Sequence, residues 1–370
     1  MSKRILIFHS SNDLYGASKI LIQVIDLLNK NGYETHVFLP YKGPLDHFFD
    51  EKQIKTTHLN FGVFRRKYFS LLGLLDRFFK IFFSIIKIVK YVKQNNIDVI
   101  YTNTSIILAS GISAILCKVP NYVHIHEIPN NNFYLRIMGF LISKFSSKII
   151  VVSKSVKSHW SKYISKPLTH IYNGVPKINI EVVSKSPSKK IKFLTIARLL
   201  PYKGHKYIIE IANELLKNNR SFEFVFLGDT FIGYQSYEDE LKSMVKQLGI
   251  EKNILFLGFD IDVSKYMLQS DFLLHCAVCP DPLPTVIFEA IQHNLSVIST
   301  NIGGSVEILN NGLGGLLIPF DDINIASKKI VRYVSDEKLI DLKKKYSSDF
   351  VEKQFSEKNF NKNIVKIFNE

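Results

Sequence analysis

Cysteine is scarce in this chain of 370 residues, which contains Cys117, Cys276 and Cys279 and no other. Three thiols cannot build a disulfide framework, so the sequence indicates a protein of a reducing compartment. The first residues, MSKRILIFHSSND, show no apolar stretch followed by a small-residue cleavage site. We therefore expect no secretory signal.

Signals for a bound metal or for nucleic acid are also weak. Cys276 and Cys279 have the spacing of half a zinc site, but a single further cysteine far away does not complete it. His124 and His126 share a face of an expected strand, and we interpret His124 as structural rather than as half of a metal pair. No DNA- or RNA-binding motif is recognisable. We expect no metal, no cofactor and no nucleic-acid partner.

Acidic residues are few in the first half of the chain. Residues 1–180 contain 24 Lys and Arg against 9 Asp and Glu, whereas residues 181–370 contain 24 of each class. The whole net charge of +15 thus lies in the first half. Such asymmetry indicates that this half meets a polyanion, for example an anionic membrane or an acidic substrate.

What the chain does have is a repeated alternation of short apolar strands and amphipathic helices. Strand, loop, helix and strand in this order form βαβ units, which build parallel sheets. The first series ends near residue 176, and a Ser-, Lys- and Pro-rich stretch follows. A second series then begins. Strands are expected at 4–10, 35–40, 99–103, 122–126 and 148–153, and again at 191–197, 222–228, 253–258, 271–276, 295–300 and 314–319.

This organisation predicts two tandem Rossmann-like, doubly wound α/β domains. The N-terminal domain covers residues 1–176 and the linker residues 177–190. The C-terminal domain covers 191–350, and a final helix in 351–370 is expected to pack back toward the N-terminal domain. In open parallel sheets, ligands bind beyond the carboxyl ends of the strands and at helix N-termini, so candidate site residues should follow strands.

Two cationic side chains follow the first strand of the second domain. Arg198 and Lys203 lie five residues apart on one strand-to-helix loop, RLLPYKG. A guanidinium group binds two phosphate oxygens at once and an ammonium group acts as a point charge, so the pair could clamp a diphosphate. Gly204 would let the backbone approach closely at the start of the next helix.

Carboxylates and glycines follow two later strands of the same domain. Asp281 lies in a Pro-rich loop and Glu289 in the following helix, where carboxylate oxygens can accept hydrogen bonds from sugar and ribose hydroxyls. In NIGGSVEIL, the pair Gly303 and Gly304 allows another close backbone approach to a phosphate or sugar, and Glu307 follows it.

Taken in order, RLLPYKG, DPLPTVIFEA and NIGGSVEILNNGLGGLLIP resemble family 4 of the glycosyltransferases, also called the group 1 transferases. The similarity continues upstream through IYNGVP, VVSKSVKSHW and YGAS, and so covers essentially the whole chain. It implies the GT-B fold, in which two Rossmann-like domains face a deep cleft. It also implies a transferase that retains the anomeric configuration and needs no metal.

The resemblance assigns roles to individual residues. Arg198 and Lys203 would hold the donor diphosphate, Asp281 the transferred sugar and Glu289 the ribose of the nucleotide. The family usually has Glu at the position of Asp281, and often two glycines in the first loop, where this chain has one. Near the donor, the residues expected to contact phosphate or sugar also include His126 and Gly16 from the first half, with Gly204, Gly303, Gly304 and Glu307 from the second.

Residues 63–93, VFRRKYFSLLGLLDRFFKIFFSIIKIVKYVK, combine basic and bulky apolar residues. Lys80, Lys87 and Lys90 interrupt the apolar run before it reaches the roughly 18–20 residues of a spanning helix. The mixture is typical of a helix that lies in a membrane interface, although an ordinary helix with one face in the core would share it.

Together these patterns predict a glycosyltransferase of bacterial surface-polysaccharide synthesis. It would use a nucleotide-sugar donor and a lipid-linked glycan acceptor, and would lie in the cytoplasm at the inner face of the plasma membrane. Two alternatives remain at this point. One is a non-hydrolysing nucleotide-sugar epimerase of the same fold, and the other is a nucleotide-sugar-binding protein that has lost catalysis.

Overall fold

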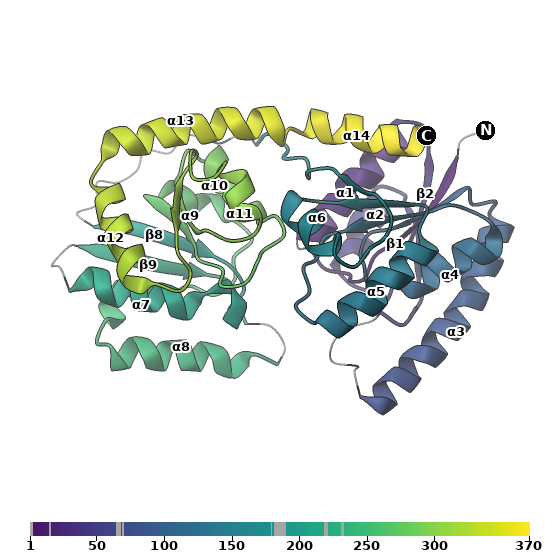
Figure 1. Cartoon of the computed structure of the whole chain (residues 1–370), viewed down its shortest axis with the longest axis horizontal. Helices are drawn as coiled ribbons and strands as arrows, with labels where there is room; N and C mark the ends of the chain where they lie inside the picture. Colours follow the sequence, from purple (N-terminus) through teal and green to yellow (C-terminus); the bar gives the residue numbers. More distant parts are fainter. Residues whose placement is uncertain are drawn as a thin grey trace. The chain divides into compact units, whose positions relative to one another are not determined.

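The structure is a computed structural model of the chain (Figure 1). It describes residues 3–14, 16–63, 68, 70–178, 180, 190–217, 221–230 and 233–370. The chain forms two compact units. The N-terminal unit comprises Met1–Gly174 together with Glu357–Glu370, and the C-terminal unit comprises Val175–Ser356. Most of the expected linker, 177–190, lies outside the described residues.

A seven-stranded parallel sheet forms the centre of the N-terminal unit, in the order β3-β2-β1-β4-β5-β6-β7. Its strands are β1 (Arg4–Phe8), β2 (Glu34–Leu39), β3 (Lys55–His58), β4 (Val99–Thr102), β5 (Asn121–Ile125), β6 (Lys148–Val151) and β7 (Leu168–His170). Its helices are α1 (Gly16–Lys30), α2 (Pro44–Glu51), α3 (Leu71–Gln94), α4 (Leu108–Cys117), α5 (Asn132–Phe145), α6 (Lys154–Trp160) and α14 (Glu357–Asn369).

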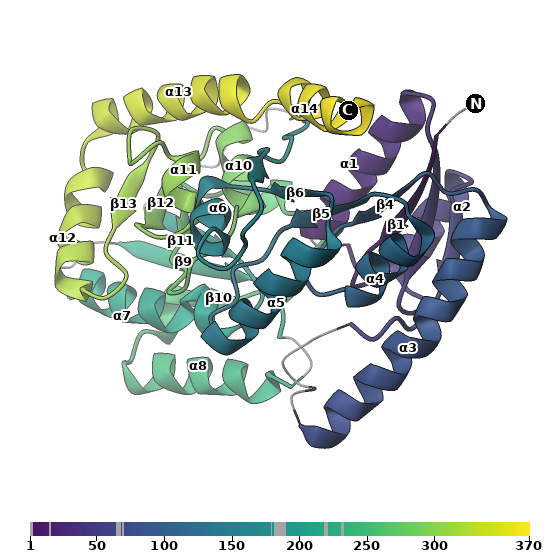
Figure 2. The same cartoon turned by 45° about the vertical axis from the view of Figure 1, so that its right-hand side comes forward.

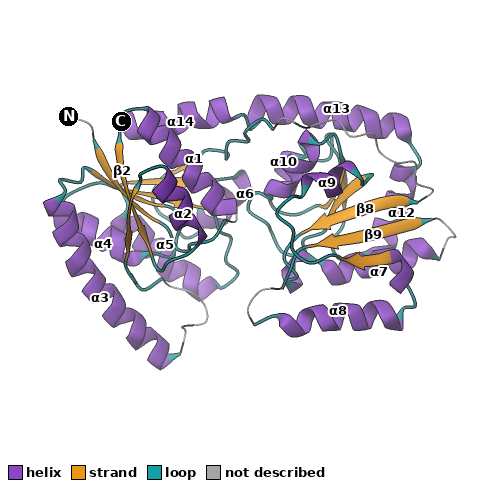
Figure 3. Ribbon diagram, turned by 180° about the vertical axis from the view of Figure 1, so that it is seen from behind, coloured by secondary structure: helices purple, strands orange, loops and turns teal. Residues whose placement is uncertain are grey.

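The C-terminal unit contains a six-stranded parallel sheet in the order β10-β9-β8-β11-β12-β13. Figure 3 shows β8 and β9 between α7 and α8 on one side and α10 and α13 on the other. The strands are β8 (Ile191–Ile196), β9 (Phe222–Leu227), β10 (Ile254–Phe256), β11 (Phe272–His275), β12 (Ser296–Thr300) and β13 (Leu316–Ile318). The helices are η2 (Pro201–Lys203), α7 (His205–Leu216), α8 (Gln235–Gln247), η3 (Glu251–Asn253), α9 (Ser264–Leu268), α10 (Thr285–Gln292), α11 (Gly304–Ile308), α12 (Ile323–Val334) and α13 (Glu337–Gln354).

The predicted fold class, two doubly wound parallel α/β domains, is confirmed by these sheets. Every strand expected from an apolar run is present within a few residues of its expected bounds. The sequence missed β3 and β7, which lie at the two edges of the N-terminal sheet. Both are short, and neither presents the continuous apolar run of a strand that is buried on both faces.

Helix α3 is partly a core helix. Ile88 and Val92 are buried beneath the sheet, with Leu6, Phe8 and Ile100 in the same apolar cluster. Its first turns instead expose large apolar side chains to solvent. Arg77, one of the basic residues of 63–93, is buried and forms an ion pair with Asp76. Its guanidinium carbon lies 3.9 Å from the centre of the Tyr68 ring. Among the described residues, no helix is long and apolar enough to cross a membrane.

The last helix, α14, completes the core of the N-terminal unit although it comes from the other end of the chain. Figure 2 shows it beside α1. The buried side chains of α14 share one cluster with residues of β1, α1 and β4. They are Phe360, Ile364, Ile367 and Phe368, the four positions that the sequence pattern places on its apolar face.

Polar contacts at the end of the chain hold α14 in place. Lys148 Nζ donates to the carbonyl oxygen of Ile367 at 2.8 Å, and Tyr33 OH donates to Asn369 at 2.7 Å. The ring of Phe368 lies 5.3 Å from that of Tyr122 and 5.8 Å from that of Tyr101. Edge-on aromatic contacts of this kind add stability beyond the burial of area.

We predict that Phe368→Ala destabilises the N-terminal unit by about 3–5 kcal/mol, because it removes a fully buried ring and leaves a cavity. Urea denaturation with an N-terminal-unit probe such as Trp160 fluorescence measures the change. Lys358→Ala, an exposed substitution on the same helix, is the control and should change the free energy of unfolding by less than about 0.5 kcal/mol. Equal stability of both variants would contradict docking of α14.

Candidate active site

Each sheet reverses its strand order at one place, between β1 and β4 in the N-terminal unit and between β8 and β11 in the C-terminal unit. Because all strands are parallel, their carboxyl ends lie on one edge, and loops from neighbouring strands meet there. The site residues predicted from the sequence lie in these loops or in the helices that follow them. We describe the two units separately.

Two glycines bring three loops of the C-terminal unit together. Gly204 has φ of +79°, and a Cβ atom added to it would lie 1.8 Å from the carbonyl oxygen of Cys276. Gly303 has φ of +65°, and its Cβ atom would lie 2.5 Å from the carbonyl oxygen of Asp281. The amide of Gly304 donates to the same oxygen at 2.7 Å. These glycines therefore pack against protein backbone, and their expected approach to phosphate or sugar stays a prediction.

The loops place Lys203 and Asp281 in direct contact. Lys203 Nζ lies 2.5 Å from Asp281 Oδ2, and the two side chains are 24% and 14% exposed. His275, at the end of β11, is buried, and its Nε2 atom lies 3.9 Å from the same carboxylate oxygen. The sequence did not single out His275, although its position at the end of a strand next to the switch point is a signal that could have found it.

Charge and burial act against each other on this group. Burial raises the pKa of Asp281, but the positive charge of Lys203 and the neighbouring His275 lower it by more, so its pKa lies below the ordinary value. Burial lowers the pKa of His275 to about 4, with Asp281 opposing the shift. At neutral pH the group is therefore an ammonium–carboxylate pair beside a neutral imidazole.

Arg198 lies on the same loop as Lys203, between β8 and α7. The pKa of Tyr202 is raised by burial, and the charges of Lys203 and Arg198 both oppose that shift. Arg198 lies two residues after the end of β8. The next residue, Leu199, fixes the loop through its amide, which donates to the carbonyl oxygen of Asp229 at 3.0 Å. The two cations of the expected clamp thus share the loop after β8, and Lys203 contacts the expected sugar ligand, Asp281, on the loop after β11.

Glu289 and Glu307 lie on the helices that follow β11 and β12. Glu289 is partly exposed on α10, and its backbone carbonyl oxygen accepts from Nδ1 of His293 at 2.7 Å. Glu307 is partly exposed on α11, four residues after Gly303. Both residues are thus partly exposed on helices that follow strands on the β11 side of the switch point.

In the N-terminal unit, Gly16 is the first residue of α1, and His126 directly follows β5. Nε2 of His126 lies 2.9 Å from Oδ1 of Asn103, which follows β4. The neighbouring His124 is fully buried, with Nδ1 2.6 Å from Tyr101 OH, and burial lowers its pKa to about 3. The sequence analysis did not identify Asn103, although it is the final residue of an expected strand.

The structure offers little for a bound metal ion. Among the described residues, no group of three or more His, Cys, Asp or Glu side chains could hold a metal ion. From the sequence we expected no Asp-x-Asp after a strand, and this was wrong: Asp260 and Asp262 form one after β10. Asp260 is paired with Lys265 at 2.6 Å and accepts from Tyr266 OH at 2.9 Å, and β10 is an edge strand far along the sheet from the switch point.

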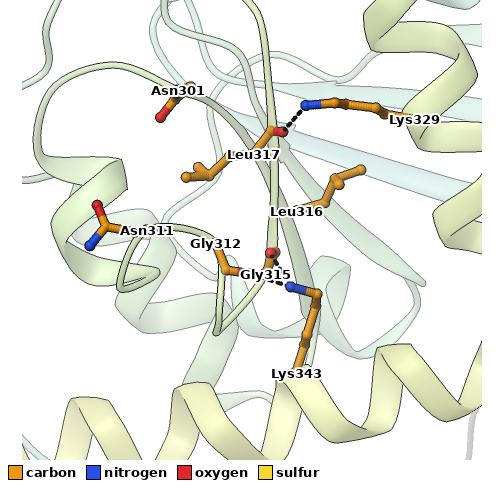
Figure 4. Close-up of a pocket in the computed structure, with 8 residues that line it drawn as sticks. All are labelled: Asn301, Asn311, Gly312, Gly315, Leu316, Leu317, Lys329 and Lys343. Carbon is orange, nitrogen blue, oxygen red and sulfur yellow. Dashed lines mark hydrogen bonds between the residues drawn. The ribbon is translucent and has the colours of Figure 1, made fainter.

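The C-terminal unit also has a pocket of about 440 Å³ that is not lined by the predicted site residues (Figure 4). Lys343 Nζ points into the turn before β13 and donates to the carbonyl oxygens of Gly312 and Gly315, and Lys329 donates to that of Leu317. The ammonium groups therefore satisfy backbone carbonyls. The lining residues, none of them a predicted site residue, are Asn301, Asn311, Gly312, Gly315, Leu316, Leu317, Lys329 and Lys343.

Comparison with known families matches both halves of the chain. The model "Glycosyl transferases group 1" matches residues 176–350, and the model "Glycosyltransferase Family 4" matches residues 15–177. The chain therefore belongs to the family 4, or group 1, glycosyltransferases, as the resemblance of its motifs indicates.

Individual relatives are distant. The chain is 24% identical over 355 residues to an Escherichia coli UDP-Gal:α-D-GlcNAc-diphosphoundecaprenol α-1,3-galactosyltransferase. The aligned region covers 90% of this chain and 88% of that protein. It is 26% identical over 242 residues to the capsular polysaccharide glycosyltransferase CapH of Staphylococcus aureus, covering 60% and 64%. The fold matches that of Anabaena HepE crystallised with UDP and glucose, with a TM-score of 0.80, 22% identity and 99% of both chains covered. The fold is GT-B.

The ion pair between Lys203 and Asp281 predicts a pH dependence of stability. Since the pKa of Asp281 is lower in the folded state, its ionised form contributes stability above the unfolded pKa, near 3.9, and this contribution is lost as pH falls through the folded pKa. We expect Asp281→Asn to lower the free energy of unfolding by about 1–3 kcal/mol at pH 7, and by less as the pH falls below about 4.

Urea denaturation between pH 3 and 7 measures this difference between wild type and variant. Asp239→Asn, an exposed substitution on α8, is the matched control and should show little difference at any pH. A difference for Asp281→Asn that stays constant across the range would show that the carboxylate gains nothing from Lys203.

Proposed function

We propose that this protein transfers a sugar from a nucleoside-diphosphate sugar to a lipid-linked glycan, with retention of configuration and without a metal ion. The observation that carries the proposal is the ion pair of Lys203 with Asp281, on the two loops that flank the switch point of the C-terminal sheet of a family 4 glycosyltransferase. Arg198 lies on the same loop as Lys203. Two cations beside a carboxylate suit a ligand that carries a diphosphate next to a sugar.

The chemistry asked of these residues is stabilisation of a leaving group. When the glycosidic bond of the donor breaks, negative charge grows on the diphosphate, and Arg198 and Lys203 would stabilise it. Lys203 has three N–H donors, so it can keep its contact with Asp281 and still reach a phosphate oxygen. Asp281, held by Lys203, would accept from sugar hydroxyls, and Glu289 from the ribose hydroxyls of the nucleotide.

The donor and acceptor classes follow relatives of known substrate. HepE was crystallised with UDP-glucose, and the E. coli relative transfers galactose from UDP to a sugar on diphosphoundecaprenol. A Campylobacter jejuni relative, 26% identical over 232 residues and covering 60% of each chain, also acts on a diphosphoundecaprenol-linked sugar. We therefore propose a UDP-sugar donor and a polyprenyl-diphosphate-linked acceptor in polysaccharide synthesis.

We predict that Arg198→Ala and Lys203→Ala each lower kcat/KM by about tenfold to a thousandfold, since each removes a charge that contacts the leaving diphosphate. Transfer from UDP-glucose or UDP-galactose to an undecaprenyl-diphosphate-linked sugar is the assay, and proton NMR of the product reports retention. Lys206→Ala, an exposed lysine three residues further on, is the control and should retain full activity. Activity should survive EDTA.

Other results would redirect the proposal. Interconversion of nucleotide sugars without an acceptor would indicate an epimerase. Binding of UDP-sugars without hydrolysis or transfer would indicate a protein that has lost catalysis. Loss of transfer on chelation, restored by Mg²⁺ or Mn²⁺, would contradict the metal-free mechanism, and wild-type activity in both cation variants would remove the diphosphate clamp.

We also propose that the N-terminal unit binds the anionic cytoplasmic face of the membrane through α3, α4 and α5, which lie side by side in Figure 1. On α3, the spacing of Phe79, Phe83, Ile86, Lys90 and Lys93 aligns apolar and basic side chains on one exposed stripe. Exposed apolar side chains on these helices are Leu72, Leu74, Leu75, Phe78, Phe79, Phe82, Phe83 and Ile86 on α3, Ile115 and Leu116 on α4, and Phe133, Ile137 and Phe140 on α5.

An anionic bilayer is the partner that matches both properties of this surface. Phenylalanine side chains can enter the acyl boundary while lysines meet anionic headgroups. A protein partner could cover the apolar groups, but the surrounding lysines and the scarcity of acids in this half favour lipid. The basic cluster Arg65, Arg66 and Lys67, expected to contribute, lies outside the described residues.

We predict that replacing Lys87, Lys90 and Lys93 by Ser weakens binding to vesicles of phosphatidylglycerol about a hundredfold, because each basic residue near an anionic surface contributes about 1 kcal/mol. Phe79→Ser with Phe83→Ser should weaken binding to the same vesicles through loss of apolar insertion. Co-sedimentation in low and high salt measures both. Phe259→Ser with Ile261→Ser, two exposed apolar residues of the C-terminal unit, is the control. Unchanged binding of both α3 variants would leave α3 as a core helix only.

A further inference from the structure

Within the N-terminal unit, a series of hydrogen-bonded polar side chains connects His126 to the first loop. His9 follows β1, Asn103 follows β4 and His126 follows β5, so the three lie at adjacent strand ends around the switch point. Asn103 is in hydrogen-bond contact with both histidines, 2.9 Å from His126 Nε2 and 3.2 Å from His9 Nδ1. His9 is in turn 3.0 Å from Ser18 Oγ on α1.

The orientation of the Asn103 amide is fixed by a backbone group. Its nitrogen lies 3.2 Å from the carbonyl oxygen of Ala17, which can only accept a hydrogen bond. The amide NH₂ must therefore face Ala17 and His9, and Oδ1 must face His126. Since Oδ1 can only accept, the Nε2 atom of His126 must carry the proton.

The hydrogen bonds at the Ser18 end of this series independently give the same orientation of the Asn103 amide. Ser18 Oγ donates to Asp13 Oδ1 at 3.0 Å, and a carboxylate can only accept. The Ser18 oxygen therefore accepts from Nε2–H of His9, and the Nδ1 atom of His9 is left to accept from Asn103. Ser11 Oγ, 3.4 Å from the same Nε2 atom, lies at the edge of hydrogen-bond distance as a second acceptor.

Neighbouring polar groups do not change this assignment. Tyr101 OH lies 3.3 Å from Asn103 Oδ1 and 2.6 Å from His124 Nδ1, and towards an amide oxygen a hydroxyl group can only donate. Burial lowers the pKa of His126 well below its ordinary value, and His124 and His9 add to the shift. The ring is therefore neutral, with one N–H.

We infer that Asn103 is a positioning residue that holds His126 in the Nε2-protonated form, so that its Nδ1 atom accepts a hydrogen bond from a hydroxyl group of a sugar. Among the described residues, no hydrogen bond reaches this Nδ1 atom, and the His126 side chain is partly exposed. A neutral acceptor selects a hydroxyl donor and disfavours a phosphate or carboxylate oxygen. The choice of sugar as ligand rests on the proposed function, whereas the protonation state does not.

Nitrogen NMR of the whole protein, labelled with ¹⁵N-histidine, tests the protonation state without any assay of activity. The His126 signals are identified by their loss in His126→Gln. We expect an N–H shift for Nε2 and an unprotonated shift for Nδ1, with the same pattern for His9. An Nδ1–H form of His126 in the wild type would overturn the inference even if Asn103→Ala does not fold.

Two variants separate positioning from simple structural damage. Asn103→Ala should release His126 into a mixture of both neutral forms, and should lower kcat/KM about tenfold if one hydrogen bond to the sugar is weakened. Ser18→Ala, the matched control, removes the hydrogen bond between Ser18 and His9 but leaves the carbonyl of Ala17 to orient Asn103. His126 should therefore keep its single, Nε2-protonated form. A single unchanged form in Asn103→Ala would contradict the role of Asn103.

Addition of UDP-glucose or UDP to the labelled protein tests the ligand. The Nδ1 signal of His126 should move with UDP-glucose and stay in place with UDP, since UDP lacks the glucose hydroxyls. If UDP-glucose binds, shown by a raised Tm, and the signal does not move, the sugar contact is wrong while the proposed function stands. If neither nucleotide binds, the proposed donor is wrong, and the protonation state still decides the role of Asn103.

Discussion

The parallel direction of the strands is the constraint on which the rest of this molecule depends. In each sheet every strand ends on the same edge, and the order reverses once, at β1/β4 and at β8/β11. Loops that are far apart in the sequence therefore meet at that edge. Residues 9, 103 and 126 become neighbours in this way, as do residues 203, 275 and 281. The glycines at 204 and 303 then allow the loops to approach within backbone contact, which side chains at these positions would prevent.

Polar groups at these two edges are compensated in different ways. In the C-terminal unit, opposite charges are paired, and the loss of solvent around Asp281 is offset by Lys203. In the N-terminal unit, neutral rings and amides are joined donor to acceptor, and burial keeps the histidines uncharged. The first arrangement suits a ligand that brings charge, such as a diphosphate, and the second suits a ligand that brings hydroxyl groups.

Sequence reasoning recovered the features that depend on local pattern. Apolar runs predicted the inner strands because a strand buried on both faces must be apolar throughout, and the period of Phe360, Ile364, Ile367 and Phe368 predicted the buried face of α14. The edge strands β3 and β7 were missed because their short, partly polar sequences lack that run, whereas the edge strands β10 and β13 have one. The roles of Gly204 and Gly303 could not be assigned, because sequence shows that a backbone must come close without showing what it approaches.

What sequence could not supply at all is the pairing of side chains across loops. Lys203 and Asp281 are 78 residues apart, and no pattern in the chain predicts that they share an ion pair. The sequence analysis did not identify Asn103 for a related reason. An asparagine at the end of a strand has many uses, and its role here follows from two acceptor-only groups, the carbonyl of Ala17 and the carboxylate of Asp13, which together fix the direction of every proton between them. The family resemblance predicts His126 as a site residue, and the protonation state inferred for its ring depends on neighbours outside that motif.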